Sequence, residues 1–498
     1  MDALLWLSQN HELATNGVTS GIIPTVLIPL TAVTVGITSL AGIIAGWFGI
    51  KLRTEGPKQF LEVLLKKRIL LSMIAVNLLG IGVYKSYVYV KTLPSFMITV
   101  KHYSGSEAKI SGETYTESRG RSHDYNGEIV PANLNSIKLI QETKLPKGAF
   151  RSGLISGNSL FYGVDDGNIY EINKNDLSVL RKFYIGTMVT TRPVIYKNRL
   201  YSGEGNHETH HARIYSFDLK TGEFINAFKT KGHTEGQPLI GSYKGVDLLF
   251  VTAGSDGLYA VDPMTMKKIW HQNDGHLDAT VTIENNFVFT GSGFEKGSSM
   301  DRSYAVAYDF ATGKQIWKKE LPLSNWMHPV VTNTDVCYTL GEIYFESTVG
   351  LFYCLNKLDG TPHFSIPYDA PLASKPYYIK NKMAGIEEEF VFFGDFKGQI
   401  HGVNITTKEK LWSVVTGSKD TNYALSSFDY DSKRGVLLYP SFDNGIFALE
   451  PKTGKIKSHW LPEKSEAKWK NNYASVSIID NFFFLMDNAG NLRKFSVE

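Results

Sequence analysis

The side chains in this sequence that are best suited to binding chemistry recur at one position of a repeated segment. Aligning the repeats places one such residue just before the expected inner strand of each copy, and four of these residues are, or can become, cationic. A ring of cationic groups would suit a small anion or an acidic side chain of a partner protein. The plainer alternative is that these groups hydrogen-bond loop carbonyls and stay solvated. The positions are Arg151, Arg192, Gln237, Thr280, His328 and Lys375, with a weaker alignment at Ser426 and Ser475.

Two histidines and two carboxylates align in the loops of neighbouring repeats, which read GHTEGQP and GHLDATV. His233 and His276 are expected to project toward the same funnel as the cationic residues. Glu235 and Asp278 are the carboxylates that would act as calcium ligands or as a general base in an enzyme. The residues around them form no catalytic pattern, so we assign no catalytic role to any residue.

A third group of possible ligands lies in the loop GEGNHETHHAR, which contains His207, His210 and His211. Imidazole is a common metal ligand, and the spacing of His207 and His210 lets two rings approach one ion. The loop has no recognised zinc-site spacing, however, and loop insertions collect polar residues without function. We therefore expect no resident metal in this loop.

The two cysteines, Cys337 and Cys354, lie in the segments DVCYTLG and GLFYCLN, which read as adjacent strands. Their spacing excludes a CxxC motif and a metal site made by cysteines alone. Two alternatives stay open, a disulfide across a hairpin or two small buried core residues. Neither alternative implies redox catalysis.

A repeat that runs from about residue 134 to residue 498 positions these side chains. Each copy contains a turn with glycine, a short strand, an acidic or amide residue, a turn that is often Thr-Gly, and an apolar strand that often ends in tryptophan. One example is SDGLYAVDPMTMKKIW. A fixed period in the forties, made of strands, is typical of propeller blades. The acidic or amide positions, 44 to 48 residues apart, are Asn173, Asp218, Asp262, Asp309, Asn356, Asn404 and Glu450, with Ser496 in the last copy.

The eight copies predict an all-β, eight-bladed β-propeller at residues 134–498. A single four-stranded sheet cannot bury both of its faces, whereas a ring of sheets buries each face against a neighbour. Apolar and polar residues alternate in runs such as NNFVFTGSG, which excludes a helical alternative. The last copy ends after its third strand, and a strand at residues 136–141 (SIKLIQ) is expected to complete its sheet.

Two apolar segments precede the repeat and predict two transmembrane α-helices, at residues 21–50 and 69–91. A membrane-spanning helix needs about 20 apolar residues, and both segments are long enough. A cleaved signal peptide is the alternative for the first segment, but residues 1–20 contain no Lys or Arg and the apolar run is too long. Gly42 and Gly46 form a GxxxG step, which would pack on the second helix or on a partner's helix.

The charges between the two apolar segments predict the orientation of the chain. Residues 51–68 carry six basic and two acidic side chains. By the positive-inside rule this loop is cytoplasmic. The N-terminal segment 1–20, a polar linker at residues 92–133 and the propeller would then lie outside the cytoplasm. In a Gram-negative bacterium this is a two-pass inner-membrane protein with both termini and the propeller in the periplasm.

The repeat resembles a known family. Segments such as GLYAVD and YDFATGKQIW are similar to the repeats of pyrroloquinoline-quinone-like (PQQ-like) β-propellers, which include quinoprotein alcohol dehydrogenases and the propeller lipoprotein of the outer-membrane β-barrel assembly machinery. The resemblance covers about residues 134–498 and implies the fold, because the repeat builds the blade and not the site. The quinoproteins hold their cofactor with calcium, a tryptophan platform, an aspartate base and, in many, two adjacent cysteines. This chain has no Cys-Cys pair, and Trp326 would be either such a platform or a packing residue.

We expect a non-enzymatic, protein-binding scaffold in an envelope complex, with other envelope or membrane proteins and the lipid bilayer as partners and no cofactor. One alternative is a membrane-bound, PQQ-dependent dehydrogenase that uses calcium. Another is an extracytoplasmic sensor of a small anion. The net charge of +3 and the lack of a nucleic-acid-binding signature argue against a nucleic-acid partner.

Overall fold

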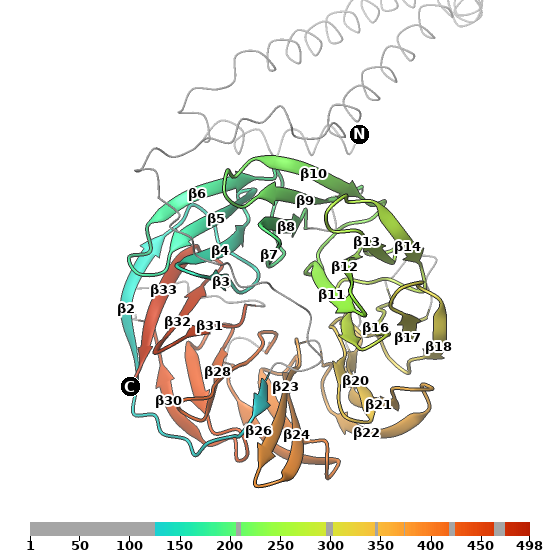
Figure 1. Ribbon diagram of the computed structural model, residues 1–498. Helices are drawn as coiled ribbons and strands as arrows, with labels where there is room; N and C mark the ends of the chain where they lie inside the picture. The colour runs from blue at the N-terminus through green and yellow to red at the C-terminus, as the bar shows by residue number, and fades with distance from the viewer. Residues whose placement is uncertain are drawn as a thin grey trace, which may run out of the picture. The chain divides into compact units, whose positions relative to one another are not determined.

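The computed structural model describes residues 125–205, 211–294, 302–343, 347–372, 374–417, 424–462 and 474–498. These residues form eight β-sheets arranged in a closed ring (Figure 1). The prediction of an eight-bladed, all-β propeller is confirmed. We call the sheets blades one to eight, in the order of their inner strands along the chain.

The first four blades are four-stranded meanders. Blade one contains β3 (Leu154–Ser156), β4 (Ser159–Val164), β5 (Asn168–Asn173) and β6 (Val179–Tyr184). Blade two contains β7 (Val194–Tyr196), β8 (Arg199–Gly203), β9 (Arg213–Asp218) and β10 (Phe224–Lys229). Blade three contains β11 (Leu239–Tyr243), β12 (Val246–Thr252), β13 (Leu258–Val261) and β14 (Lys268–Gln272). Blade four contains β15 (Thr282–Glu284), β16 (Phe287–Gly291), β17 (Tyr304–Asp309) and β18 (Gln315–Glu320).

The remaining blades follow the same plan, with additions from the N-terminal part of the chain. Blade five contains β19 (Val330–Val331), β20 (Asp335–Gly341), β21 (Gly350–Asn356) and β22 (Pro362–Tyr368). Blade six contains β23 (Tyr377–Met383), β24 (Ile386–Gly394), β25 (Gln399–Asn404) and β26 (Glu409–Val415), with β1 (Tyr125–Gly127) beside β23. Blade seven contains β27 (Asp429–Asp431), β28 (Val436–Pro440), β29 (Ile446–Leu449) and β30 (Ile456–Trp460). Blade eight contains β31 (Ser477–Ile479), β32 (Phe482–Met486), β33 (Asn491–Val497) and β2 (Ile137–Lys144).

The first strand of each meander lies nearest the axis of the ring, and the last strand lies on its outer wall. Figure 1 shows β3, β7 and β11 around the centre and β6, β10, β14 and β18 at the periphery. Because neighbouring strands are antiparallel, the links between blades and the turns between second and third strands share one face of the ring. We call this the loop face and the opposite one the turn face.

The N-terminal strand β2 closes the ring. It pairs antiparallel with β33, from Ile137 opposite Val497 to Lys144 opposite Asn491. The prediction that residues 136–141 complete the last sheet is therefore confirmed. Pairing of strands from the two ends of the propeller removes the open edge that a seven-and-three-quarter-bladed ring would present.

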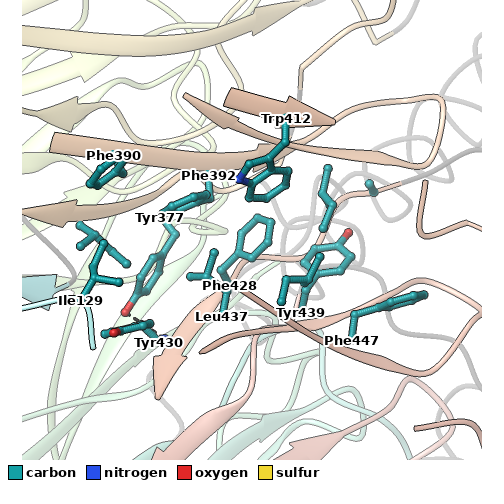
Figure 2. Close-up of a cluster of buried hydrophobic side chains, with 14 residues drawn as sticks. Ile129, Tyr377, Phe390, Phe392, Trp412, Phe428, Tyr430, Leu437, Tyr439 and Phe447 are labelled. Atoms are coloured by element: carbon teal, nitrogen blue, oxygen red, sulfur yellow. Dashed lines mark hydrogen bonds between the residues drawn. The ribbon is translucent and has the colours of Figure 1, made fainter. Parts of the chain in front are cut away.

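The propeller begins earlier than the sequence suggested, because residues 125–133 belong to it and not to a polar linker. Strand β1 pairs in parallel with β23, with Tyr125 opposite Ile379. Ile129 is buried in the core between blades six and seven, where Figure 2 shows it near Tyr377 and Phe390. The sequence did not predict this contact, because a three-residue strand and one buried isoleucine within a polar segment form no recognisable strand pattern.

The tryptophans and glycines of the repeat join neighbouring blades. Trp270 in β14 donates its indole N–H to the carbonyl of Phe310 in the next blade, at 3.0 Å. Gly313, in the turn after β17, has φ of +68°, and a Cβ at that position would lie 2.6 Å from the indole of Trp270. Trp317 and Trp412 make the equivalent bonds to Lys357 and Pro451. The Thr-Gly turn and the terminal tryptophan therefore recur because each blade uses them to dock on the next.

The predicted membrane segments lie outside the described residues. This applies to the helices at residues 21–50 and 69–91, to the loop at residues 51–68, and to Gly42 and Gly46. No helix of membrane-spanning length and apolarity occurs among the residues that the structure describes.

Candidate functional site

The residues predicted to line a rim all lie on the loop face. Each precedes the first strand of its blade by two or three residues, from Arg151 before β3 to Lys375 before β23. Arg192 and Gln237, before β7 and β11, are both half-buried. The common spacing follows from the meander, which brings the chain over the loop face before each inner strand.

Three of these residues come from different blades and carry basic side chains, and we call Arg151, His328 and Lys375 the basic cluster. Burial, followed by the positive charges of Lys375 and Arg151, holds the pKa of His328 well below its usual range. Blades one and five lie on opposite sides of the eight-membered ring, so the basic cluster draws on residues from both sides of its axis. His328 is therefore neutral at pH 7, between two permanent cations.

Trp326 lies in the same loop as His328, and its side chain is buried. Its side chain is 5% exposed, and its indole N–H donates to the carbonyl of Gly341 at 3.1 Å. A Cβ on Gly293 would lie 2.6 Å from its ring, so the indole is packed directly against that backbone. Trp326 is thus a packing residue between blades four and five and presents no open face to a cofactor.

The histidines of two neighbouring loops converge on one carboxylate, and we call His233, His276 and Asp278 the His–Asp–His cluster. His233 Nε2 lies 2.8 Å from Asp278 Oδ1, and His276 Nε2 lies 2.7 Å from the same oxygen. The loop after β10 carries the first histidine, and the loop after β14 carries the other two residues. Both imidazoles are buried, and the carboxylate is 12% exposed.

The surroundings of the His–Asp–His cluster hold it in place. Although burial opposes ionisation, hydrogen bonds from His233 and His276 keep the pKa of Asp278 well below its usual range. A hydrogen bond of 2.9 Å joins His276 Nδ1 to Ser255 Oγ. Backbone bonds of 3.1 Å between Gly254 and Leu277 fix the second loop against the turn of blade three. Asp278 is therefore a buried carboxylate anion held between two imidazoles.

The other candidate ligands do not join this cluster. Glu235 aligns with Asp278 in the sequence, but it is not among the grouped ligand atoms in the described part of the chain. His211 is exposed, whereas His207 and His210 lie outside the described residues. Cys337 and Cys354 face each other in β20 and β21 and form a disulfide.

Ser255 is a member of the site that sequence reasoning did not find. It lies in the turn between β12 and β13, which shares the loop face with the link that carries His276. A signal was present, because second-to-third-strand turns and inter-blade links always lie together in a meander. Identifying Ser255 itself required the side-chain geometry.

Comparisons with known proteins agree with this architecture. The family model described as outer membrane protein assembly factor BamB matches residues 301–468. Quinohemoprotein alcohol dehydrogenase ADH-IIG of Pseudomonas putida is 21% identical over 392 residues, which are 69% of this chain and 52% of that protein. The chain therefore spans about half the length of this curated relative.

Two solved structures show the same fold at low sequence identity. BamB from Moraxella catarrhalis is 14% identical with a TM-score of 0.52, covering 72% of this chain and 99% of that one. Quinohemoprotein alcohol dehydrogenase from Comamonas testosteroni is 11% identical with a TM-score of 0.52, covering 73% and 76%. Taken with the eight-bladed ring and its repeat, these matches support a PQQ-like propeller family for the described part of this chain, which is similar to these proteins in fold.

Proposed function

We propose that this chain is an inner-membrane-anchored, periplasmic propeller that acts as a non-enzymatic, protein-binding scaffold within an envelope complex. The two apolar segments at residues 21–50 and 69–91 anchor it, and the propeller presents its loop face to an acidic segment of a protein partner. The basic cluster is the single observation that carries this proposal.

The basic cluster concentrates positive charge near the axis of the ring. Arg151 and Lys375 come from different blades, and both positive charges lower the pKa of the half-buried His328. Cations that converge near a partly desolvated site attract a carboxylate more strongly than scattered surface lysines do. Because His328 is neutral, it can accept or donate a hydrogen bond there without adding further repulsion.

The likeness to BamB supports a scaffold in the envelope. The matching family model is described as an outer membrane protein assembly factor, which is a role in assembling other proteins. A fold shared at 14% identity does not transfer that role by itself. It does make protein binding at a propeller face a function that this architecture can perform.

The proposal is tested by purifying the full chain from mild detergent with its partners, after chemical cross-linking. Arg151→Gln combined with Lys375→Gln should reduce recovery of the main partner at least about tenfold, which corresponds to about 1.4 kcal/mol of binding free energy. Lys244→Gln combined with Lys382→Gln is the matched control, because it removes the same charge from the turn face. Equal recovery of partners with both double variants, or a chain that is purified alone, would contradict the proposal.

A PQQ-dependent dehydrogenase is the second candidate, favoured by the 21% identity to a quinohemoprotein alcohol dehydrogenase. The described residues do not fit that cofactor. Trp326 is buried against Gly293 and offers no platform, and Asp278 is held between two histidines and is not open as a base. The test adds PQQ and calcium to the purified chain and measures dye reduction with a panel of alcohols and sugars. We expect no reduction above background. Reduction that depends on PQQ and on one of these substrates would favour the dehydrogenase over the scaffold.

A sensor of a small anion would use the same basic cluster. Titrating the purified chain with phosphate and sulfate separates this alternative from the scaffold. Binding that is lost in the Arg151→Gln and Lys375→Gln double variant, without any protein partner, would favour the sensor.

A further inference from the structure

We propose that His233, His276 and Asp278 form a binding site for a divalent transition metal of the Zn²⁺ class, which joins the loops leading into blades three and four. The inference is independent of the proposed scaffold function. It rests on the geometry of the three ligand groups, on the residue that orients one of them, and on their burial.

The three ligand groups are already gathered at the spacing that a metal requires. One ligand atom from each residue lies within 4.8 Å of the others, and the two Nε2–Oδ1 distances are 2.8 Å and 2.7 Å. Ligands at about 2.0–2.2 Å from Zn²⁺ in a tetrahedral arrangement lie about 3.3 Å from one another. Lengthening the two Nε2–Oδ1 distances by about half an ångström through small side-chain movements would give them the spacing of metal ligands.

The donor set selects the class of metal. Two imidazole nitrogens and one carboxylate suit Zn²⁺ and other late first-row divalent ions, whereas Ca²⁺ and Mg²⁺ prefer oxygen ligands. The carboxylate of Asp278 would supply a negatively charged ligand to the ion. The carboxylate is the most exposed of the three groups, so solvent can supply a fourth ligand.

Surrounding residues orient the ligands in the way that metal sites use. The hydrogen bond between Ser255 Oγ and His276 Nδ1 engages one ring nitrogen, so Nε2 faces Asp278. The ring of Trp326 meets that of His276 edge-on, with centroids 6.3 Å apart, and supplies an apolar wall. Gly254, at φ of +53°, leaves room for the ring of His233, since a Cβ there would lie 2.3 Å from it.

A metal at this position would tie together the two loops that link three consecutive blades. His233 precedes β11, and the other two ligands precede β15, so the ion would bridge links between three consecutive blades. A ligand that binds only the folded state raises the thermal midpoint of unfolding as its concentration rises. The inference therefore predicts a stabilising effect of Zn²⁺ on the propeller, separate from any partner binding.

The test measures metal binding to the full chain in detergent after removal of metals with a chelator. Elemental analysis after dialysis against Zn²⁺ should give one ion per chain, and Co²⁺ should give the intense visible absorption of a tetrahedral site. Asp278→Asn and His276→Ala should each weaken binding by more than about tenfold, because even the loss of a group that only orients a metal ligand costs about 10–100-fold. Zn²⁺ should raise the thermal midpoint of the wild-type chain and not that of these variants.

Two controls distinguish this site from other histidines. His363→Ala removes a histidine that pairs with a single carboxylate, Asp335, at 2.7 Å, and it should leave the stoichiometry unchanged. A triple variant with His207, His210 and His211 replaced by alanine should also bind one ion. Loss of binding only in the triple variant would overturn the proposal. So would a wild-type chain that binds no Zn²⁺ or gives no tetrahedral Co²⁺ spectrum, whether or not His276→Ala folds.

Discussion

At the scale of single residues, the state of His328 reports whether the basic cluster exists. Burial and the charges of Lys375 and Arg151 lower the pKa of this imidazole in the folded protein, while the unfolded chain has the ordinary value of about 6.5. Between these two values the unfolded state binds a proton that the folded state does not. Stability from this group is therefore present above about pH 6.5 and is lost as the pH falls below it.

Lys375→Gln should raise the pKa of His328 toward its ordinary value, because one of the two opposing charges is removed. The pKa is measured from the imidazole C–H resonance in an NMR titration. The loss of unfolding free energy between pH 7 and pH 5 should be smaller in this variant than in the wild type. Lys244→Gln, on the turn face, should leave the resonance unchanged, and an identical titration in all three proteins would show that Lys375 does not act on His328.

At the scale of elements, the joint between neighbouring blades is made by a tryptophan that lies over a glycine with positive φ. Trp270 and Gly313 form one such joint, and Trp317 with Gly360 forms the next. The contact is close enough that a methyl group on either glycine would enter the indole ring. Glycine is therefore required at this position for two reasons: the turn needs a positive φ, and the neighbouring blade leaves no room for a side chain.

Gly313→Ala should lower the free energy of unfolding by about 1–3 kcal/mol more than Gly245→Ala does, the usual cost of overpacking. Both glycines have positive φ, at +68° and +80°, so both variants carry the same backbone strain of about 1 kcal/mol. Only Gly313 meets an indole, since a Cβ on Gly245 has nothing within 4 Å. Denaturant unfolding of the two variants measures the difference, and equal losses would mean that backbone strain alone explains the glycine.

At the scale of the whole molecule, stability depends on closing the ring with strands from both ends of the propeller. Strand β2 covers the edge of β33, and Leu134 and Ile137 enter the core shared by blades seven and eight. Strand β1 and Ile129 add a smaller contact on blade six.

A propeller that begins at residue 145 should unfold without a sharp transition and aggregate, because it lacks β2 and exposes the edge of β33. A propeller that begins at residue 134 keeps β2 and loses only β1 and Ile129, so it should stay monomeric with a lower thermal midpoint. Size-exclusion chromatography and thermal unfolding compare the two. A monomeric, equally stable protein starting at residue 145 would show that ring closure by β2 is dispensable.

The sequence by itself determined the number of blades, the strand that closes the ring and the face on which the rim residues lie. Positions such as Asp218, Asp262 and Asp309 recur because each copy of the repeat encodes its own turn: their carboxylates accept hydrogen bonds from backbone N–H groups two or three residues later. These turns depend only on residues close in the sequence. Each copy of the repeat therefore predicts its own turn, and the next copy shows the same pattern.

Only the tertiary structure decided which of these residues meet. The alignment of His233 with His276 was visible in the sequence, but their convergence on Asp278 depends on how two loops pack. The burial of Trp326 was equally undetermined, since either a platform or a packing residue fits the same sequence. The reason is physical: a repeat specifies each blade through contacts close in the chain, whereas these side chains meet where one blade packs against the next, through contacts that no single copy of the repeat specifies.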